Sequence, residues 1–424
     1  MAAKIHVSSI NSYIDEQLTI KITGCKKNTK VSVHAITYDE KQKKFSSYAT
    51  FIANKKGIVD ISSQQPIAGS YDEADAAGLF WSMRCTSSKL DDYFEKNNAN
   101  KVSINLILET EKEVLDDVTI HRYFYMKDTI KEYVQEEKIT GALFHPKQKG
   151  RYPAALILSG SDGGMQEHAA ALLASKGYVT LALAYFGVEG LPKNLENIPL
   201  EYFQEATKWL KQLPYVNGNI SLIGHSRGGE LALLLGAIFD DYQSIIASAP
   251  STHMTPGMRS GIFTSTSSWT LNQQPLPSIT FKFRLQTIFS MLKNWLLKKP
   301  ISYLSIWDDT LKIQEKTENA RISVENIRIP IMFIAGRDDQ LWPSSQYVNA
   351  IENSLQNKHN RYLYYENAGH FLSFPYSFVS LPANVFMNVG GGMTMTFGGF
   401  KQANAKAAKN SWEEILTFLK ENNN

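Results

Sequence analysis

From residue 154 onward the sequence alternates between short apolar runs and helical patterns, and this alternation strongly limits how the chain can fold. The runs are nearly continuous in Val, Ile, Leu and Ala, as is typical of strands buried on both faces of a parallel sheet. We therefore predict an α/β fold with a mostly parallel, doubly wound sheet. The expected strands are 154–158, 179–184, 220–223, 245–249, 329–335 and 361–365, with helices near 166–176, 200–213, 344–356 and 404–421 and another after residue 226.

The first 125 residues follow a different pattern, in which apolar and polar residues alternate with period two. Several such segments separated by turn-forming residues indicate an antiparallel β-sandwich. The expected strands are 17–22, 31–38, 48–53, 78–85, 102–109 and 118–125. A chain of 424 residues has room for two or three domains. We place a β-sandwich domain at residues 1–127 and an α/β domain at residues 128–424, with a polar stretch at 126–140 between the two patterns.

One connection in the second half is unusually long. About 80 residues separate the expected strands at 245–249 and 329–335, where connections of 2–6 residues are usual. We treat residues 250–328 as an insertion. Its segment 283–300 has apolar residues mostly at helical spacing, and this helix either forms a lid over a ligand site or packs on the sheet with its lysines in water. The glycine-rich stretch 390–399 is expected to be a loop.

Composition narrows the classes of function. The net charge is only +3 without a dense Lys/Arg block, so we expect no nucleic-acid partner. No apolar run reaches the roughly 18 residues of a membrane span. The two cysteines, Cys25 and Cys85, form no disulfide framework, and no metal-spaced cluster occurs, so we expect no metal or redox cofactor. With no signal-peptide core at the N-terminus, we expect a cytoplasmic protein. The oligomeric state is left open.

A serine motif stands at the centre of the second half. The segment SLIGHSRGGELALLLGA (221–237) contains the pattern G-x-S-x-G at residues 224–228, with an apolar run before it and a helix-forming run after it. This is the strand–turn–helix context of a nucleophile elbow, in which small residues let strand and helix approach closely while the serine hydroxyl stands above the sheet. We predict that Ser226 is a nucleophile, and that the adjacent His225 is structural or lines the pocket.

A nucleophilic serine needs a base and an acid that orients the base, and in this fold they follow in the order Ser, Asp, His. Asp339 and His370 each come directly after an expected strand. Catalytic groups gather at the carboxyl ends of strands in open α/β sheets. We therefore predict a triad of Ser226, Asp339 and His370, with Asp338 as a less favoured rival for the acid.

The negative charge that develops on an attacked carbonyl oxygen requires fixed hydrogen-bond donors. The backbone N–H of Arg227, directly after the nucleophile, is one candidate. The loop SGSDGG (159–164) follows the strand at 154–158, and we assign the second donor to the backbone of Ser161. Substrate contacts are assigned to Arg227 and to Gly160 and Asp162 of the same loop.

Several further segments are informative, and one of them, within 172–210, is much more distinctive than the serine motif. They are GALFHP (141–146), SGSDGG (159–164), LLASKGYVTLALAYFGVEGLPKNLENIPLEYFQEATKWL (172–210), GRDDQLW (336–342) and YYENAGHFLSFPY (364–376). Together with the motifs above, they resemble the acyl-CoA thioesterase / bile acid-CoA:amino acid N-acyltransferase family over nearly the whole chain. The resemblance implies a β-sandwich followed by an α/β-hydrolase domain, with Ser226, Asp339 and His370 as the triad. It also implies acyl thioesters of coenzyme A as substrates.

The resemblance implies hydrolysis to the free acid and coenzyme A through an acyl-enzyme. The family's N-acyltransferases carry cysteine at the nucleophile, whereas this chain has serine, as the thioesterases do. Amines attack a thioester intermediate more readily than an oxygen ester, so serine favours water as acceptor. Acyl transfer to an amino acid, carboxylesterase activity and a non-catalytic acyl-CoA binding protein are the alternatives. The candidates for binding the phosphates of coenzyme A are Arg227, Arg337, Lys293, Lys298 and Lys299.

Overall fold

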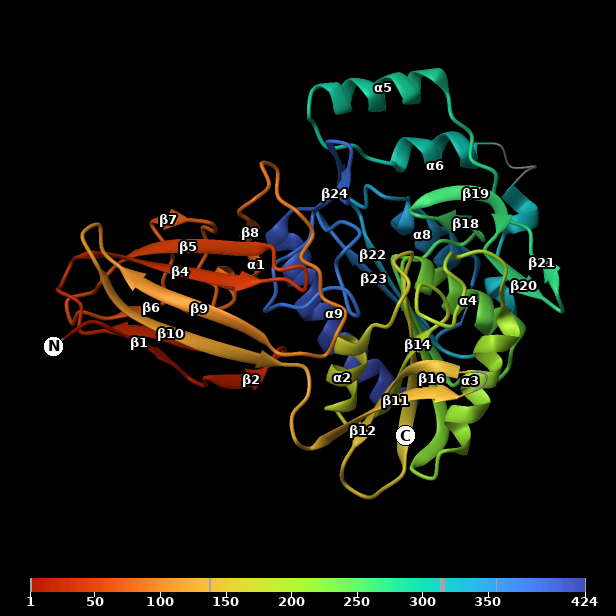
Figure 1. Cartoon of the computed structure of the whole chain (residues 1–424), viewed down its shortest axis with the longest axis horizontal. Coiled ribbons are helices and arrows are strands. Elements are labelled where there is room, and N and C mark those ends of the chain that lie inside the picture. Colours follow the sequence, from red (N-terminus) through yellow and green to blue (C-terminus); the bar gives the residue numbers. More distant parts are fainter. Residues whose placement is uncertain (1, 137–138, 313–316, 356, 424) are drawn as a thin grey trace.

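Two systems of β-sheet occupy different halves of the chain (Figure 1). They are seen in a computed structural model that describes residues 2–136, 139–312, 317–355 and 357–423. The N-terminal sheets end with β10 (Val114–Tyr123), and a larger sheet begins with β11 (Thr129–Glu136). We assign the boundary between the two domains to residues 127 and 128, in the link between these strands.

The larger sheet has the topology of an α/β-hydrolase. Its strands lie in the order β11, β12 (Ile139–Pro146), β14 (Val179–Ala184), β13 (Tyr152–Leu158), β16 (Val216–His225), β17 (Ser244–Ser248), β22 (Ile331–Gly336) and β23 (Arg361–Tyr365). The pairs β11–β12 and β12–β14 are antiparallel, and every later pair is parallel. The predicted parallel sheet is therefore confirmed, with an antiparallel edge added to it.

Helices cover both faces of this sheet. On one face, α2 (Glu167–Ala174) and α9 (Lys401–Asn422) share an apolar core with the N-terminal sheets. On the other face, the core contains α3 (Leu200–Gln212), α4 (Arg227–Ile238) and α8 (Ser344–Ser354). Successive strand residues point to opposite faces and are buried on both, which explains the nearly continuous apolar runs in the sequence.

The N-terminal half contains a three-stranded and a seven-stranded sheet, which are antiparallel except that β2 and β10 pair in parallel. In β4 and β5, buried residues alternate with more exposed ones, as the period-two pattern predicts. The strands preceding β10 are β1 (Lys4–Val7), β2 (Asn11–Tyr13), β3 (Ile20–Thr23), β4 (Lys30–Tyr38), β5 (Lys44–Ile52), β6 (Val59–Asp60), β7 (Ala68–Gly69), β8 (Arg84–Cys85) and β9 (Val102–Glu109).

Two predicted elements are different in the structure. The strand expected at 78–85 is the short helix α1 (Gly78–Trp81) followed by β8. All four residues of α1 are buried, and a segment that is apolar on every side has no period that distinguishes a helix from a strand. The loop expected at 390–399 contains part of a hairpin formed by β24 (Phe386–Gly390) and β25 (Met393–Thr396).

The insertion lies between β17 and β22. Its helix α5 (Leu285–Leu296) falls within the predicted 283–300, and it stands at the outer side of the molecule, beyond α6 (Leu304–Leu311) (Figure 1). None of the helices in the described part of the chain is long and apolar enough to cross a membrane. The other elements of the insertion are β18 (Pro256–Arg259), β19 (Ile262–Ser267), β20 (Trp269–Leu271), which pairs with β15 (Ile198–Pro199), β21 (Gln274–Pro275), η1 (Glu318–Ala320) and η2 (Val324–Asn326).

Candidate active site

Ser226 occupies the sharp turn between β16 and α4. Its backbone angles are φ 58° and ψ −122°, a conformation that non-glycine residues rarely adopt. The turn is held by a hydrogen bond from the Ser226 N–H to the carbonyl oxygen of Ser248, at 2.9 Å. Strain of this kind persists only where the surrounding structure fixes it, and it is characteristic of a nucleophile elbow.

The glycines of the motif are required by close approach of the backbone. A Cβ atom on Gly224 would lie 2.0 Å from the carbonyl oxygen of Gly228, and one on Gly228 would lie 2.7 Å from the carbonyl oxygen of Ser159. Any side chain at either position would force β16, α4 and the loop after β13 apart. The two glycines of the G-x-S-x-G pattern are therefore required by the close approach of strand and helix, as predicted.

Asp339 and His370 form a buried hydrogen-bonded pair. His370 Nδ1 lies 2.9 Å from Asp339 Oδ2, and the two side chains are only 1% and 2% exposed. The carboxylate is held by further donors, namely the backbone N–H groups of Leu341 and Trp342 and the hydroxyl of Ser344, at 2.6 Å. These contacts fix the carboxylate, which in turn fixes the imidazole and its tautomer.

The rival acid Asp338 has other partners. Its carboxylate accepts hydrogen bonds from Gln340 Nε2 and from the backbone N–H of Gly399, each at 2.8 Å. Asp338 thus joins the loop after β22 to the segment before α9. The hydrogen bonds favour Asp339 as the residue that orients His370.

The second ring nitrogen of His370 has no hydrogen-bond partner among the described residues, although it is buried. Because Nδ1 faces Asp339, Nε2 is the atom left to exchange a proton with a nucleophile. The ring lies beside that of His225, the residue before Ser226, with 5.0 Å between the ring centroids. The carboxyl ends of β16, β22 and β23 thus bring the three predicted triad residues to one edge of the sheet.

His225, predicted to be structural or to line the pocket, packs among residues next to the base. Its Nδ1 lies 3.0 Å from the hydroxyl of Ser248, and its ring stacks on Phe371 with 5.8 Å between centroids. Burial lowers the pKa of His225 well below its usual range, and the neighbouring His370 adds to this effect. A neutral His225 adds no positive charge beside the base.

In the loop after β13, Gly160 and Asp162 are linked to Tyr376. The backbone N–H of Gly160 donates to the Tyr376 hydroxyl at 2.6 Å, and this hydroxyl donates to Asp162 Oδ1 at 2.5 Å. The N–H of Gly160 is therefore engaged within the protein. Ser161, between them, is exposed. The sequence singled out no role for Tyr376, since it lies 214 residues from Asp162.

The side chain of Arg227 does not have the predicted role. It is 1% exposed, and its guanidinium bonds Glu230 Oε2 at 3.3 Å, the Ser268 hydroxyl at 2.7 Å and the carbonyl oxygen of Pro256. The expectation that this side chain binds a substrate's phosphates is wrong, because it is turned inward and joins α4 to the insertion. Its backbone N–H still lies at the start of α4, where helix N–H groups have no intrahelical partner.

The other predicted phosphate ligands are dispersed. Arg337 pairs with Glu366, with 2.6 Å between Nε and Oε1, and both side chains are largely exposed. Lys293, Lys298 and Lys299 are exposed on and just after α5. Within the described residues, no group of three or more His, Cys, Asp or Glu side chains is placed to hold a metal ion.

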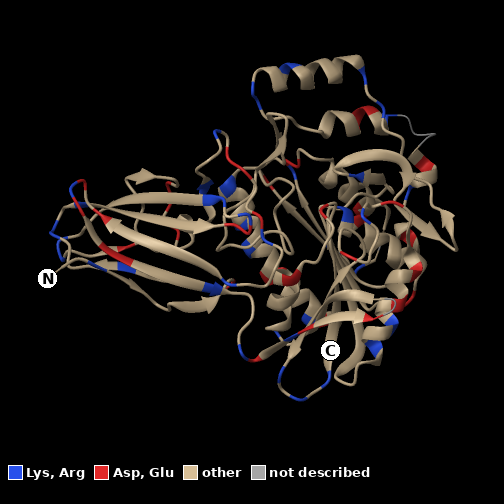
Figure 2. Cartoon of the chain, in the orientation of Figure 1, with Lys and Arg blue, Asp and Glu red and all other residues tan. Residues whose placement is uncertain are grey.

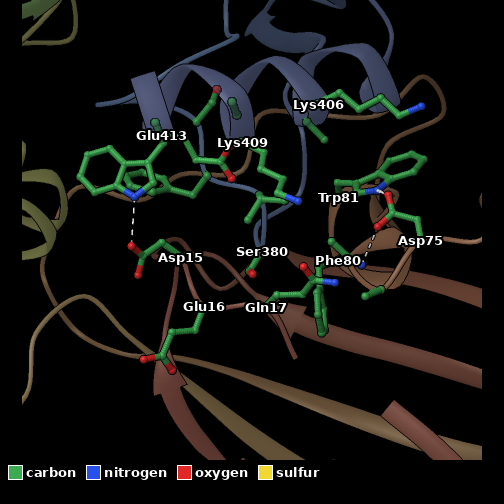
Figure 3. Close-up of a pocket in the computed structure, with 18 of the residues that line it drawn as sticks. Asp15, Glu16, Gln17, Asp75, Phe80, Trp81, Ser380, Lys406, Lys409 and Glu413 are labelled. Atoms are coloured by element: carbon green, nitrogen blue, oxygen red, sulfur yellow. Dashed lines mark hydrogen bonds between the residues drawn. The ribbon is translucent and has the colours of Figure 1, made fainter. Parts of the chain in front are cut away.

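A separate cavity of about 360 Å³ lies between the N-terminal sheets and α9 (Figure 3). Trp412 donates to Asp15 at 3.0 Å on one side, and Trp81 donates to Asp75 at 2.8 Å on the other. Its lining includes none of the three predicted triad residues. The cavity therefore belongs to the contact between the two halves of the chain and not to the candidate active site.

The strand order, the strained serine turn and the buried Asp–His pair define a protein of the α/β-hydrolase class. Comparison with known families narrows this class further. Residues 198–424 match the family described as BAAT / Acyl-CoA thioester hydrolase C terminal, and residues 15–136 match the acyl-CoA thioester hydrolase/BAAT N-terminal region. The chain belongs to this acyl-CoA thioester hydrolase/BAAT family, and the predicted resemblance is confirmed.

Individual relatives align over almost the full length of the chain. Acyl-coenzyme A thioesterase 1 of Mus musculus is 28% identical, over 96% of this chain and 93% of its own length. Acyl-coenzyme A thioesterase 6 of Mus musculus is 29% identical, over 99% and 96%. Acyl-coenzyme A amino acid N-acyltransferase 1 of Mus musculus is 28% identical, over 99% and 98%. The relatives thus include both thioesterases and acyltransferases.

Proposed function

We propose that this protein hydrolyses acyl-CoA thioesters to free acids and coenzyme A, with Ser226 as nucleophile, His370 as base and Asp339 as the orienting acid. The observation that carries the proposal is the buried pair of Asp339 and His370, in which the His370 Nε2 has no partner among the described residues and the ring lies beside that of His225, the residue before Ser226. Family membership supports the thioester substrate class.

The reaction follows from the roles of these three side chains. His370 Nε2 takes the proton of the Ser226 hydroxyl as the serine oxygen attacks the thioester carbonyl. The sulfur of coenzyme A leaves readily, since an ordinary thiol has a pKa of about 8.5, and it takes the proton that His370 received from Ser226. A water molecule then attacks the acyl-serine while His370 takes its proton, and His370 returns this proton to the Ser226 oxygen as the free acid leaves.

The oxyanion of each tetrahedral intermediate requires donors that are already in place. We assign these to the backbone N–H groups of Arg227 and Ser161. The first lies at the N-terminus of α4, and the second lies in the exposed part of the loop between Gly160 and Asp162. Removing one such donor typically costs about 3–4 kcal/mol of transition-state stabilisation. The bonds from Tyr376 to Gly160 and Asp162 support this loop.

Water is the proposed acceptor because the nucleophile is serine. Activated water readily hydrolyses an oxygen ester such as acyl-serine, whereas an amine reacts more readily with a thioester intermediate. The N-acyltransferases among the relatives keep acyl transfer as the second candidate.

We place this activity in a reducing compartment, the cytoplasm. The support is chemical: both Cys25 and Cys85 are free thiols. Cell fractionation with a detector for this chain tests the assignment, and recovery of the chain only in organelle lumens would contradict it.

The activity is tested by following release of free coenzyme A thiol from acyl-CoAs of increasing chain length, with and without glycine or taurine. We expect thiol release that is matched by free acid, and loss of release in Ser226→Ala. Acyl-amide formation that outpaces hydrolysis would replace the proposal with acyl transfer. Release by Ser226→Ala at the rate of the unmodified protein would remove Ser226 from the mechanism.

A further inference from the structure

Helix α5 presents an extended apolar face to solvent. Leu285, Phe289 and Leu296 are 73%, 66% and 67% exposed, so most of each side chain contacts water. Exposed apolar residues are common singly, but a contiguous set on one helix marks an interaction surface. The exposed apolar residues on and beside α5 are Phe283, Leu285, Ile288, Phe289, Leu292, Trp295, Leu296 and Leu297, and we call this set the α5 apolar face.

The orientation of α5 is the reverse of the usual one for a surface helix. A helix of a water-soluble domain turns its apolar stripe to the core and its polar stripe to water. In α5 the buried residue is Thr287, whose hydroxyl donates to Asp309 of α6 at 2.6 Å. Thr287 and Asn294 lie on one side at helical spacing, whereas Leu285, Phe289 and Leu296 lie on the opposite side. The polar side is anchored, so the apolar side is free.

Further contacts hold α5 in this orientation at both ends. Arg284 Nε pairs with Asp309 Oδ1 at 3.3 Å at the start of the helix. Near its end, the indole N–H of Trp295 donates to the carbonyl oxygen of Gly391, in the turn between β24 and β25, at 3.0 Å. The exposed face is therefore the result of specific contacts beneath the helix.

All charged residues between Asp241 and Asp308, the interval that contains α5, are basic, and of these Arg259 and Arg284 pair with Glu196 and Asp309 from outside the interval. No Asp or Glu occurs between Asp241 and Asp308, although the chain contains 41 acidic residues. Figure 2 shows basic positions on α5 and at both of its ends, and no acidic position on it. The basic residues of this interval are Arg259, Lys282, Arg284, Lys293, Lys298 and Lys299. An apolar face bordered by Lys and Arg matches the surface of a bilayer that contains anionic lipid.

We propose that α5 docks the protein on anionic lipid bilayers, with the α5 apolar face lying in the interface between headgroups and acyl chains. Leu285, Phe289 and Leu296 enter the apolar boundary, and Lys293, Lys298 and Lys299 pair with lipid phosphates. This surface goes beyond the proposed thioesterase reaction and does not depend on it. The helix lies on the membrane and does not cross it, since it has only 12 residues.

The same observations argue against a second copy of this chain as the occupant. Two α5 faces brought together would bring the exposed Lys293, Lys298 and Lys299 of both copies to one interface without a carboxylate from either interval, and like charges at an interface are unfavourable. An anionic lipid surface supplies the missing charge.

The test is flotation of the full chain with lipid vesicles. One set contains phosphatidylcholine with about 30% phosphatidylserine, and the other contains phosphatidylcholine alone. We expect flotation with the anionic vesicles that weakens as salt is added. The variant Phe289→Gln/Leu296→Gln is expected to lose about tenfold or more of the bound fraction. Lys293→Gln/Lys298→Gln/Lys299→Gln is expected to bind weakly at every salt concentration.

The matched control is Val114→Gln, which removes an apolar side chain that is 62% exposed on β10, far from α5 in the sequence. This control is expected to float like the unmodified chain. None of the changed residues is in a core, so we expect each variant to fold. Circular dichroism and thermal unfolding verify this. No flotation of the unmodified chain, or equal flotation of Phe289→Gln/Leu296→Gln, would overturn the proposal. The proposal would also be overturned if the unmodified chain formed a dimer that Phe289→Gln/Leu296→Gln dissociates and did not bind vesicles.

Discussion

At the scale of single residues, the candidate site depends on which atom each side chain leaves free. His370 has one nitrogen against Asp339, and the other has no partner in the part of the chain that the structure describes. Each carboxylate oxygen of Asp339 is held by neighbouring donors. Arg227 is the opposite case, because both terminal nitrogens of its guanidinium are bonded inside the protein. Proximity to Ser226 along the chain therefore does not decide whether a side chain meets the substrate.

Two adjacent carboxylates provide a residue-scale test. Asp339→Asn is expected to lower kcat for thioester hydrolysis by about 10⁴-fold, since an amide at this position favours the wrong tautomer of His370. Asp338→Asn is the matched control and is expected to change kcat only a few fold, because Asp338 bonds Gln340 and Gly399 instead. Steady-state rates of thiol release measure both. Equal losses in the two variants would contradict the assignment of the acid.

At the scale of elements, the strands and helices of the second half could largely be predicted from sequence, because burial on both faces leaves long apolar runs. The predicted 179–184 and 361–365 coincide with β14 and β23. Segments of mixed pattern could not be predicted in this way. β11 has a largely exposed face at the sheet edge and lies in the polar stretch 126–140, while α1 is apolar on every side.

The residues of the candidate site likewise fall into those that the sequence predicts and those that it does not. The residues after buried strands could be predicted because the strand marks their position, as for Asp339 and His370. Partners that arrive from distant parts of the chain could not be predicted. Tyr376 bonds the loop after β13, and Thr255 and Trp269 of the insertion bond Glu230. Such contacts depend on how elements pack, and local sequence carries no signal for them.

The buried pair of Arg227 and Glu230 gives an element-scale prediction about how the insertion is attached to α4. Burial raises the pKa of the Glu230 carboxyl, and Arg227 opposes that shift. Glu230→Gln is expected to lower the free energy of unfolding by about 3–5 kcal/mol, because it leaves a buried cation without its partner. Chemical denaturation measures this change.

An exposed pair on α3 provides the control for this prediction. Glu205 lies 3.3 Å from Lys208, and both side chains are about half exposed. Glu205→Gln is expected to change the free energy of unfolding by less than about 1 kcal/mol. A loss in Glu230→Gln no larger than that of the control would show that the buried pair does not stabilise the fold.

At the scale of the whole molecule, the N-terminal half reaches the surroundings of the site. Tyr93, in the irregular segment between β8 and β9, lies against Phe371, the residue after His370, with 5.1 Å between ring centroids. Lys401 at the start of α9 pairs with Asp91 at 2.8 Å, and one apolar core extends through both halves. We therefore expect the two halves to unfold together.

His168 on α2 lies within this shared core and predicts a pH dependence. Its ring packs on Phe124 and Phe378, and burial lowers its pKa to about 3. Below pH 6.5 the unfolded chain binds a proton at this histidine and the folded chain does not. The free energy of unfolding therefore decreases as the pH is lowered from 6.5 to 3, and this residue has no effect on it above pH 6.5. Between pH 6.5 and pH 5 the loss from this residue is about 2 kcal/mol.

His168→Gln removes this titration and retains a hydrogen-bond donor for the Asn97 carbonyl oxygen, which lies 3.1 Å from His168 Nδ1. The variant is less stable at pH 7 but is expected to lose less stability than the unmodified chain on going to pH 5. Denaturation curves at both pH values measure the difference. Parallel losses in the two proteins would mean that His168 is not held neutral in the folded state.

The central claim is that the acyl group passes from coenzyme A to Ser226 before it reaches water. The most direct measurement is peptide mass spectrometry of the chain, quenched in acid shortly after it is mixed with an acyl-CoA. The account predicts the mass of the acyl group on the peptide that contains Ser226, and its absence in Ser226→Ala. An acyl group found on another residue instead, or rapid thiol release with no acyl-serine at any time, would contradict it.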